Sequence, residues 1–249
     1  MLCKSQRRLA CIAGLGIVIS VPVVLGVCAG PATGISAFAS IATLSAVLVA
    51  LFSEWIVIAF LPARLRLTAG RPTLALWKDR KSGERVGKGW FFGLYAVNER
   101  LWPHAKNCQV YLRALYRPNG KDGWEAEPLS GRLPFRWGLS RFMPERITVT
   151  SQGWEVAFGS ISKPDKAPSP TPFEPTLLTR TFNFEHRVQA GQRAIFKLQP
   201  FAENGREETF QYFEVSWDGE WTEDPIEIKR HVQIREVTQE WESRDRAEA

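Results

Sequence analysis

Residues 210–221 read Phe210-Gln211-Tyr212-Phe213-Glu214-Val215-Ser216-Trp217-Asp218-Gly219-Glu220-Trp221. From Phe213 to Trp217, apolar and polar side chains alternate, a period of two that is typical of a strand with one buried face. Asp-Gly favours a tight turn, so we predict that a strand ends at Trp217 and that a hairpin follows directly. The segment indicates an antiparallel β-domain.

Similar short runs recur along the chain after Pro62, separated by clusters of Gly, Pro, Asn and Asp. Two of these clusters, at residues 118–120 and 203–205, predict further hairpins. We predict strands at Thr73–Lys78, Trp90–Asn98, Cys108–Leu115, Leu133–Trp137, Ile147–Thr150, Trp154–Ile161, Leu177–Phe184, Ala194–Pro200, Phe210–Trp217 and His231–Val237. Because no soluble helix is convincing, they predict a β-sandwich over residues 67–238.

Two segments depart from this pattern. Residues 162–175 contain five prolines among polar side chains, which predicts a long exposed loop. Residues 239–249 form a charged tail, for which we expect fraying or a short helix.

The first 66 residues have a composition that suits a lipid bilayer rather than water. Glu54 is the only charged side chain between Leu9 and Pro62. The apolar runs 9–29 and 35–61 are each long enough, at about 1.5 Å per residue, to cross a hydrocarbon core of about 30 Å. We therefore predict a transmembrane helical hairpin over residues 1–66. A cleaved signal peptide is the alternative, but the length of the first run argues against it.

Basic residues flank the predicted hairpin. Three precede the first span, the loop between the spans has none, and Arg64, Arg66 and Arg71 follow the second span. The positive-inside rule then places both termini in the cytoplasm. From Arg64 to Arg141 there are sixteen Lys and Arg against six Asp and Glu, whereas residues 201–249 have six against fourteen. We therefore expect the basic half, and these three arginines first, to meet anionic headgroups.

Glu54 allows two interpretations. If the second span ends near Phe52, the carboxylate lies at the cytoplasmic interface beside Trp55. If the span continues to Leu61, Glu54 is buried in the bilayer and needs a polar partner, which neighbouring copies of the helix would supply.

Four segments of the chain are similar to those of a known group of proteins: 96–98 (Ala-Val-Asn), 105–110 (Ala-Lys-Asn-Cys-Gln-Val), 134–137 (Pro-Phe-Arg-Trp) and 213–221. With them, the chain resembles an uncharacterised group of bacterial membrane-anchored proteins that have a cytoplasmic immunoglobulin-like β-sandwich. The resemblance covers the greater part of the chain after Pro62. The resemblance implies an immunoglobulin-like fold and a location in the bacterial inner membrane. It implies no activity.

No pattern for catalysis or for a cofactor survives inspection. Gly83, Gly87 and Lys88 lack the spacing of a phosphate-binding loop. The three histidines are far apart, and no second metal ligand lies at a suitable spacing. Cys108 alternates with Val110 and Leu112, which predicts a buried side chain rather than a nucleophile. We expect no enzymatic activity, no metal and no cofactor.

Ten tryptophans raise the question of a binding surface. A sandwich core needs large side chains, so we assign Trp90, Trp137 and Trp217 to the core. Trp102 and Trp124 lie in predicted loops beside basic residues and are the candidates for surface binding.

These observations favour a non-enzymatic binding or scaffold protein. We expect its β-sandwich to dock at the inner leaflet and to contact a protein partner or another copy of the chain. The alternative is a ligand-sensing membrane effector whose helices oligomerise to perturb the bilayer, as in some antiphage proteins. A nucleic acid partner is not expected, since no recognition element is visible.

Overall fold

The computed structural model describes residues 39, 42–47, 50, 61–78, 84–120, 123–127, 129, 131–138, 144–178, 186–205 and 209–245. The chain divides into two compact units, Met1–Pro62 and Ala63–Ala249. Among the described residues, no helix is long and apolar enough to cross a membrane. The predicted span 9–29, Glu54 and most of the span 35–61 lie outside the described residues; of the second span, residues 39, 42–47 and 50 are helical.

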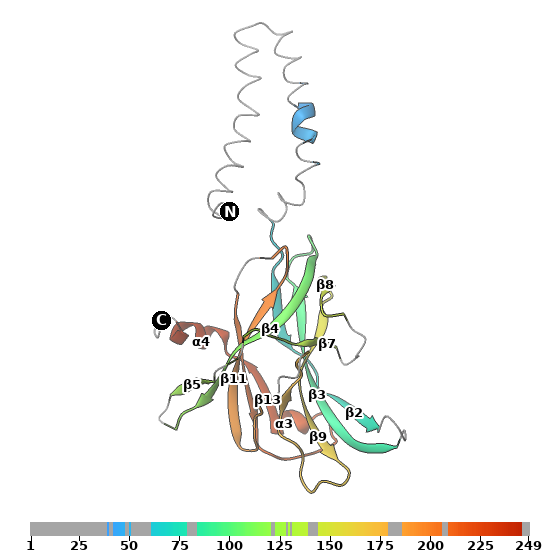
Figure 1. The fold of residues 1–249 in the computed structure, drawn as a ribbon, viewed down its shortest axis with the longest axis vertical. Helices are drawn as coiled ribbons and strands as arrows, with labels where there is room; N and C mark the ends of the chain where they lie inside the picture. The colour runs from blue at the N-terminus through green and yellow to red at the C-terminus, as the bar shows by residue number, and fades with distance from the viewer. Residues whose placement is uncertain are drawn as a thin grey trace. The chain divides into compact units, whose positions relative to one another are not determined.

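The second unit is mainly β and contains two antiparallel sheets (Figure 1). The first sheet has six strands in the order β1-β3-β9-β10, with β2 also paired to β3 and β7 to β9. Its strands are β1 (Leu65–Ala69), β2 (Thr73–Lys78), β3 (Arg85–Asn98), β7 (Arg136–Trp137), β9 (Trp154–Pro164) and β10 (Glu174–Pro175).

The second sheet has seven strands in the order β13-β12-β11-β4-β5, with β6 and β8 also paired to β4. Its strands are β4 (Ala105–Pro118), β5 (Trp124–Glu127), β6 (Leu133–Pro134), β8 (Ile147–Val149), β11 (Gln192–Phe201), β12 (Gln211–Trp217) and β13 (Val232–Glu236). Two short helices, α3 (Ile228–His231) and α4 (Thr238–Asp245), flank β13 in the chain.

Aromatic side chains from both sheets form the core. Phe158 of β9 lies at its centre, with ring centroids 5.2 Å from Phe196 and 6.2 Å from Phe213 of the other sheet. Phe135 and Phe173 pack against the same ring at 5.7 and 5.8 Å. Such contacts between facing sheets are what a β-sandwich needs, and the predicted sandwich is confirmed at this level. Trp90, Trp137 and Trp217 are buried, as predicted.

The predicted hairpin at Asp218-Gly219 is wrong. Gly219 does turn the chain, with a φ of 99°. However, Trp217 pairs with Val232, so residues 218–231 separate the two strands. The chain leaves the sheet because it has apolar groups to bury: Ile228 is fully buried, and the Trp90 indole N–H donates to the carbonyl of Thr222 at 2.7 Å.

The segment 162–175 is also more ordered than predicted. β9 continues to Pro164, and the chain then returns so that Thr171 N donates to Ser162 O at 2.6 Å. Phe173 is fully buried in the core. Its ring occupies the space above Gly159, where a Cβ would lie 2.2 Å from Phe173 Cζ. One large apolar side chain among the prolines is enough to bring the segment back to the sheet.

Among the described elements, the sequence prediction missed the strands β1, β5 and β10 and the helix α3. β1 begins at Leu65, two residues before the predicted start of the sandwich, and β5 lies where a loop was expected. α3 contradicts the expectation that the sandwich contains no helix. α4 covers the start of the predicted tail, where a short helix was one of the two expectations.

α4 covers a second, smaller hydrophobic cluster on the seven-stranded sheet. Trp241 is only 7% exposed and packs with Ile195, Tyr212 and Val237. Its ring also stacks edge-on against Trp124 of β5, at 5.2 Å between centroids. The β-domain therefore includes both β1 and α4.

Candidate functional site: the Ala63 end of the sandwich

One end of the sandwich receives the chain from residue 62. There Ala63 N donates to Asn204 O at 2.9 Å, and Asn98 N donates to Thr150 O at 3.2 Å. Lys106 N donates to the side chain of the same Asn204 at 2.8 Å. These contacts bring together Ala63, the loop 99–104, the turn 150–153 and the turn 202–205. We call this region the Ala63 end.

The loop 99–104 at the Ala63 end exposes two large apolar side chains. Leu101 is 80% exposed and Trp102 is 59% exposed. Pro103 beside them is buried, and the Trp102-Pro103 peptide bond is cis. Exposed aliphatic and aromatic residues next to each other on a loop form a compact apolar tip.

Two buried asparagines hold this loop. Asn98 is 1% exposed; its side-chain oxygen accepts from Arg64 N at 3.2 Å and from Arg100 N at 3.3 Å. Its amide group donates to Pro103 O at 2.8 Å. Asn204 is 3% exposed and donates to His104 O at 2.8 Å. Because both ends of the loop are tied to buried amides, Leu101 and Trp102 are presented on a fixed backbone.

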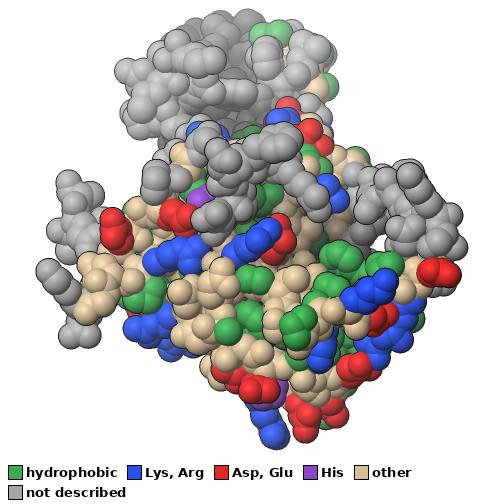
Figure 2. All heavy atoms as spheres, turned by 60° about the horizontal axis from the view of Figure 1, so that its bottom comes forward, with side chains coloured by type: hydrophobic (Ala, Val, Ile, Leu, Met, Phe, Trp, Pro, Cys, Tyr) green, Lys and Arg blue, Asp and Glu red, His purple; other side chains and the backbone are tan. Residues whose placement is uncertain are grey.

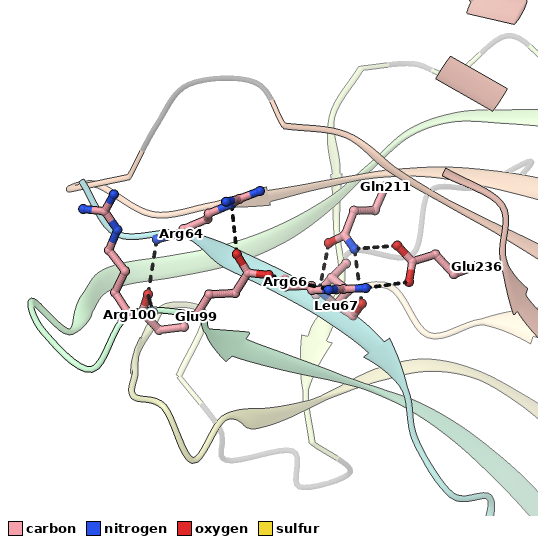
Figure 3. A network of polar contacts seen from close by, with 8 residues as sticks. Arg64, Arg66, Leu67, Glu99, Arg100, Gln211 and Glu236 are labelled. Atoms are coloured by element: carbon pink, nitrogen blue, oxygen red, sulfur yellow. Dashed lines mark hydrogen bonds and ion pairs between the residues drawn. The ribbon is translucent and has the colours of Figure 1, made fainter. Parts of the chain in front are cut away.

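The arginines at this end take part in a network of ion pairs (Figure 3). Arg64 lies 2.9 Å from Glu99, and Arg66 lies 3.7 Å from both Glu99 and Glu236. The side chains of Arg64 and Arg66 stay 68% and 54% exposed. Pairs this exposed contribute at most about 1 kcal/mol each, so they leave the guanidinium groups accessible while offsetting their charge.

Gln211 joins this network to the core of the sandwich. Its side chain accepts from Leu67 N at 2.7 Å and donates to Leu67 O at 3.2 Å (Figure 3). The same amide group lies 3.3 Å from Glu236. A side chain of β12 therefore completes the backbone hydrogen bonding of β1, which fixes the first strand after the Ala63 end against the opposite sheet.

The predicted site residues separate into two groups. Arg64, Arg66 and Trp102 come together at the Ala63 end. Arg71 is exposed in the connection between β1 and β2, beyond the strand that leads away from this end. Trp124 pairs with Pro118 at the opposite end of β4, roughly 45 Å away for a strand of this length.

Trp124 lies in a strand rather than in a loop, and its ring packs against other side chains of the domain. It is half-buried in β5, stacks against Trp241, and carries the guanidinium of Arg193 over its ring at 5.0 Å. α4 packs against it through Trp241, and the role of Trp124 in surface binding stays a prediction. The sequence alone gave no sign of this contact, which joins residues far apart in the chain.

The strong charge asymmetry along the sequence does not become two charged poles. Packing of the two sheets and of the connection 218–231 places basic strands of the first half beside acidic residues of the second, as in the pairs Arg66–Glu236 and Lys88–Glu223. At the Ala63 end, Arg64, Arg66, Arg100 and Lys106 lie near Glu99, Glu203 and Glu236. The net charge of this end is thus small and positive.

The described residues contain no group of three or more side chains suited to a metal ion. Cys108 is fully buried, its thiol donates to Ala105 O at 3.1 Å, and burial raises its pKa to about 12. At neutral pH this thiol stays protonated, so it is not a ready nucleophile. Lys88 and its neighbouring glycines lie within β3, which is not the strand-to-helix turn of a phosphate loop.

No family model, curated protein or solved structure matches the chain.

Proposed function

We propose that the chain is a non-enzymatic membrane-anchored binding protein of the bacterial inner membrane, with two N-terminal spans and a cytoplasmic immunoglobulin-like β-sandwich. In this proposal the sandwich docks on the inner leaflet through the Ala63 end and offers its other surfaces to a protein partner. The observation that carries the proposal is the exposed pair Leu101 and Trp102, held on a fixed loop where the apolar run 35–61 joins the sandwich.

Apolar insertion outweighs charge in this account. Burying a large apolar side chain contributes about 1.5–3 kcal/mol, and a basic residue near anionic lipid about 1 kcal/mol. The four basic side chains of the Ala63 end are largely offset by the three carboxylates around them. Leu101 and Trp102 therefore supply most of the attraction, and tryptophan is a residue that favours the membrane interface.

The test is the binding of residues 63–245 to lipid vesicles. This fragment keeps β1 and α4, which the predicted sandwich 67–238 cuts. We expect binding to anionic vesicles that falls only modestly at high salt. The double variant Leu101→Ser/Trp102→Ser should bind at least about tenfold more weakly, because it removes the apolar tip.

The matched control is Leu76→Ser/Ile226→Ser, which removes two exposed apolar side chains (57% and 69%) away from the Ala63 end. It should bind like the wild type. Vesicle binding that is equally weak in both double variants, or unchanged in Leu101→Ser/Trp102→Ser, would contradict docking through this end.

A further inference from the structure

A hollow of about 520 Å³ lies at the end of the sandwich opposite Ala63. The ends of β4, β11 and β12, the start of β13, and α3 surround it. Figure 2 brings this end forward and shows basic, acidic and hydrophobic side chains interspersed on it. The volume lies in the range of small-molecule sites, about 300–1,000 Å³.

Three arginines line the hollow, against a single carboxylate. Arg193 stacks on Trp124 and lies 3.7 Å from Glu214, and Arg117 Nε lies 3.1 Å from Glu127 of β5. Both guanidinium groups are thus held in place by neighbours on the rim. Arg230, in α3, has no ion-pair partner among the described residues.

The single carboxylate of the lining, Asp218, is already engaged. It lies 2.8 Å from His231 Nδ1 and accepts from Glu220 N at 2.9 Å. Desolvation pushes the pKa of Asp218 upward, but the hydrogen bonds and the charge of His231 outweigh it, so the pKa lies below its ordinary value. Asp218 therefore stays ionised and paired. Glu127 and Glu214 offset part of the charge of Arg117 and Arg193, so Arg230 supplies the lining's uncompensated positive charge.

Neutral donors complete the lining. Arg193 pairs with Ser216 across β11 and β12, and Ser216 pairs with Gln233 across β12 and β13, so the three form one cross-strand row. Gln192 adds a second side-chain amide. Guanidinium forks with hydroxyl and amide donors suit an anion that accepts several hydrogen bonds at once, as a phosphate group does.

We propose that this hollow is a binding site for a small phosphate-bearing molecule, with Arg117, Arg193 and Arg230 as its anion-binding residues. The site lies at the end of the sandwich away from the docking loop, so the inference does not depend on membrane docking. A bound phosphate compound would bridge α3 and β11.

The test is calorimetric titration of the full chain in neutral detergent micelles with inorganic pyrophosphate, at constant ionic strength. We expect saturable binding that Arg230→Gln weakens by about tenfold, because one charge-assisted hydrogen bond is lost. The control is Lys229→Gln, which removes one positive charge from the same helix at an exposed residue outside the lining. It should change the affinity less than twofold.

Two results would overturn the proposal. One is the absence of saturable pyrophosphate binding at millimolar concentrations. The other is an equal loss of affinity in Arg230→Gln and Lys229→Gln, which would indicate a general electrostatic effect rather than a site. Arg230 is exposed, so its replacement leaves the core intact and either result can be interpreted.

Discussion

Replacement of Phe158 by alanine is expected to lower the free energy of unfolding by about 3–5 kcal/mol. The reason is its position between the sheets, where its ring meets four other phenylalanine rings with centroids 5.2 to 6.2 Å away. Those rings belong to strands and bridges of both sheets, which cannot all close on the vacated space. A loss of this size approaches the whole stability of many domains.

Urea unfolding of residues 63–245, followed by far-UV circular dichroism, measures the effect of Phe158→Ala. The control is Leu76→Ala, whose side chain is 57% exposed on β2 and which should change stability by less than about 0.5 kcal/mol. Equal stabilities for Phe158→Ala and Leu76→Ala would mean that the two sheets do not pack on this ring.

Replacement of Asn98 by alanine is the second large effect, and it connects stability to the docking loop. The change leaves Arg64 N, Arg100 N and Pro103 O without their side-chain partner. A buried group that loses its partner costs about 1–3 kcal/mol, and relaxation of the loop towards water recovers part of this. We expect a loss of about 2–4 kcal/mol.

Hydrogen exchange of the backbone amides in 99–104, together with urea unfolding, measures the effect of Asn98→Ala. Exchange in the loop should accelerate more than exchange in β4, because the loop loses its anchors directly. Gln152→Ala is the control at the same end, since Gln152 is exposed and only its backbone is bonded to Thr150. Unchanged loop exchange in Asn98→Ala would show that the asparagine does not order the loop.

Strands with strong local patterns were predictable from the sequence. β2 spans Thr73–Lys78 as predicted, because its apolar run is bounded by proline and by charged residues. β3 and β4 were placed correctly but are longer than predicted. Two of their extra residues are polar: Arg85 pairs with Lys78 of β2, and Lys106 N donates to the Asn204 side chain. A local pattern does not reveal such contacts.

The connection after Trp217 shows why a strong local signal can still fail. Asp-Gly is compatible with a hairpin, but burying Ile228 and bonding Trp90 to Thr222 decided the path of the chain. Such contacts join residues more than a hundred positions apart. Phe173 similarly overrides the prolines around it.

The candidate site was predictable only in part. The exposure of Trp102 was predicted, because it lies in a predicted loop beside basic residues. Its neighbour Leu101 and the two anchoring asparagines were missed, although an asparagine at the end of a predicted strand, as at Asn98, was a usable signal. The ion pair between Arg66 and Glu236 could not be predicted, because Glu236 is distant in sequence and β13 brings it close.

The most direct test of membrane docking is the depth of residue 101 in the bilayer. A spin label is placed by Leu101→Cys in the full chain, in anionic nanodiscs, with Cys3, Cys11 and Cys28 replaced by serine. Cys108 stays unlabelled because it is fully buried and its pKa is raised to about 12. The account predicts that power saturation with oxygen and a water-soluble relaxant places the label in the headgroup region, whereas a label at Ile226→Cys remains in water. A label at residue 101 with the same access to the water-soluble relaxant as the one at residue 226 would contradict it.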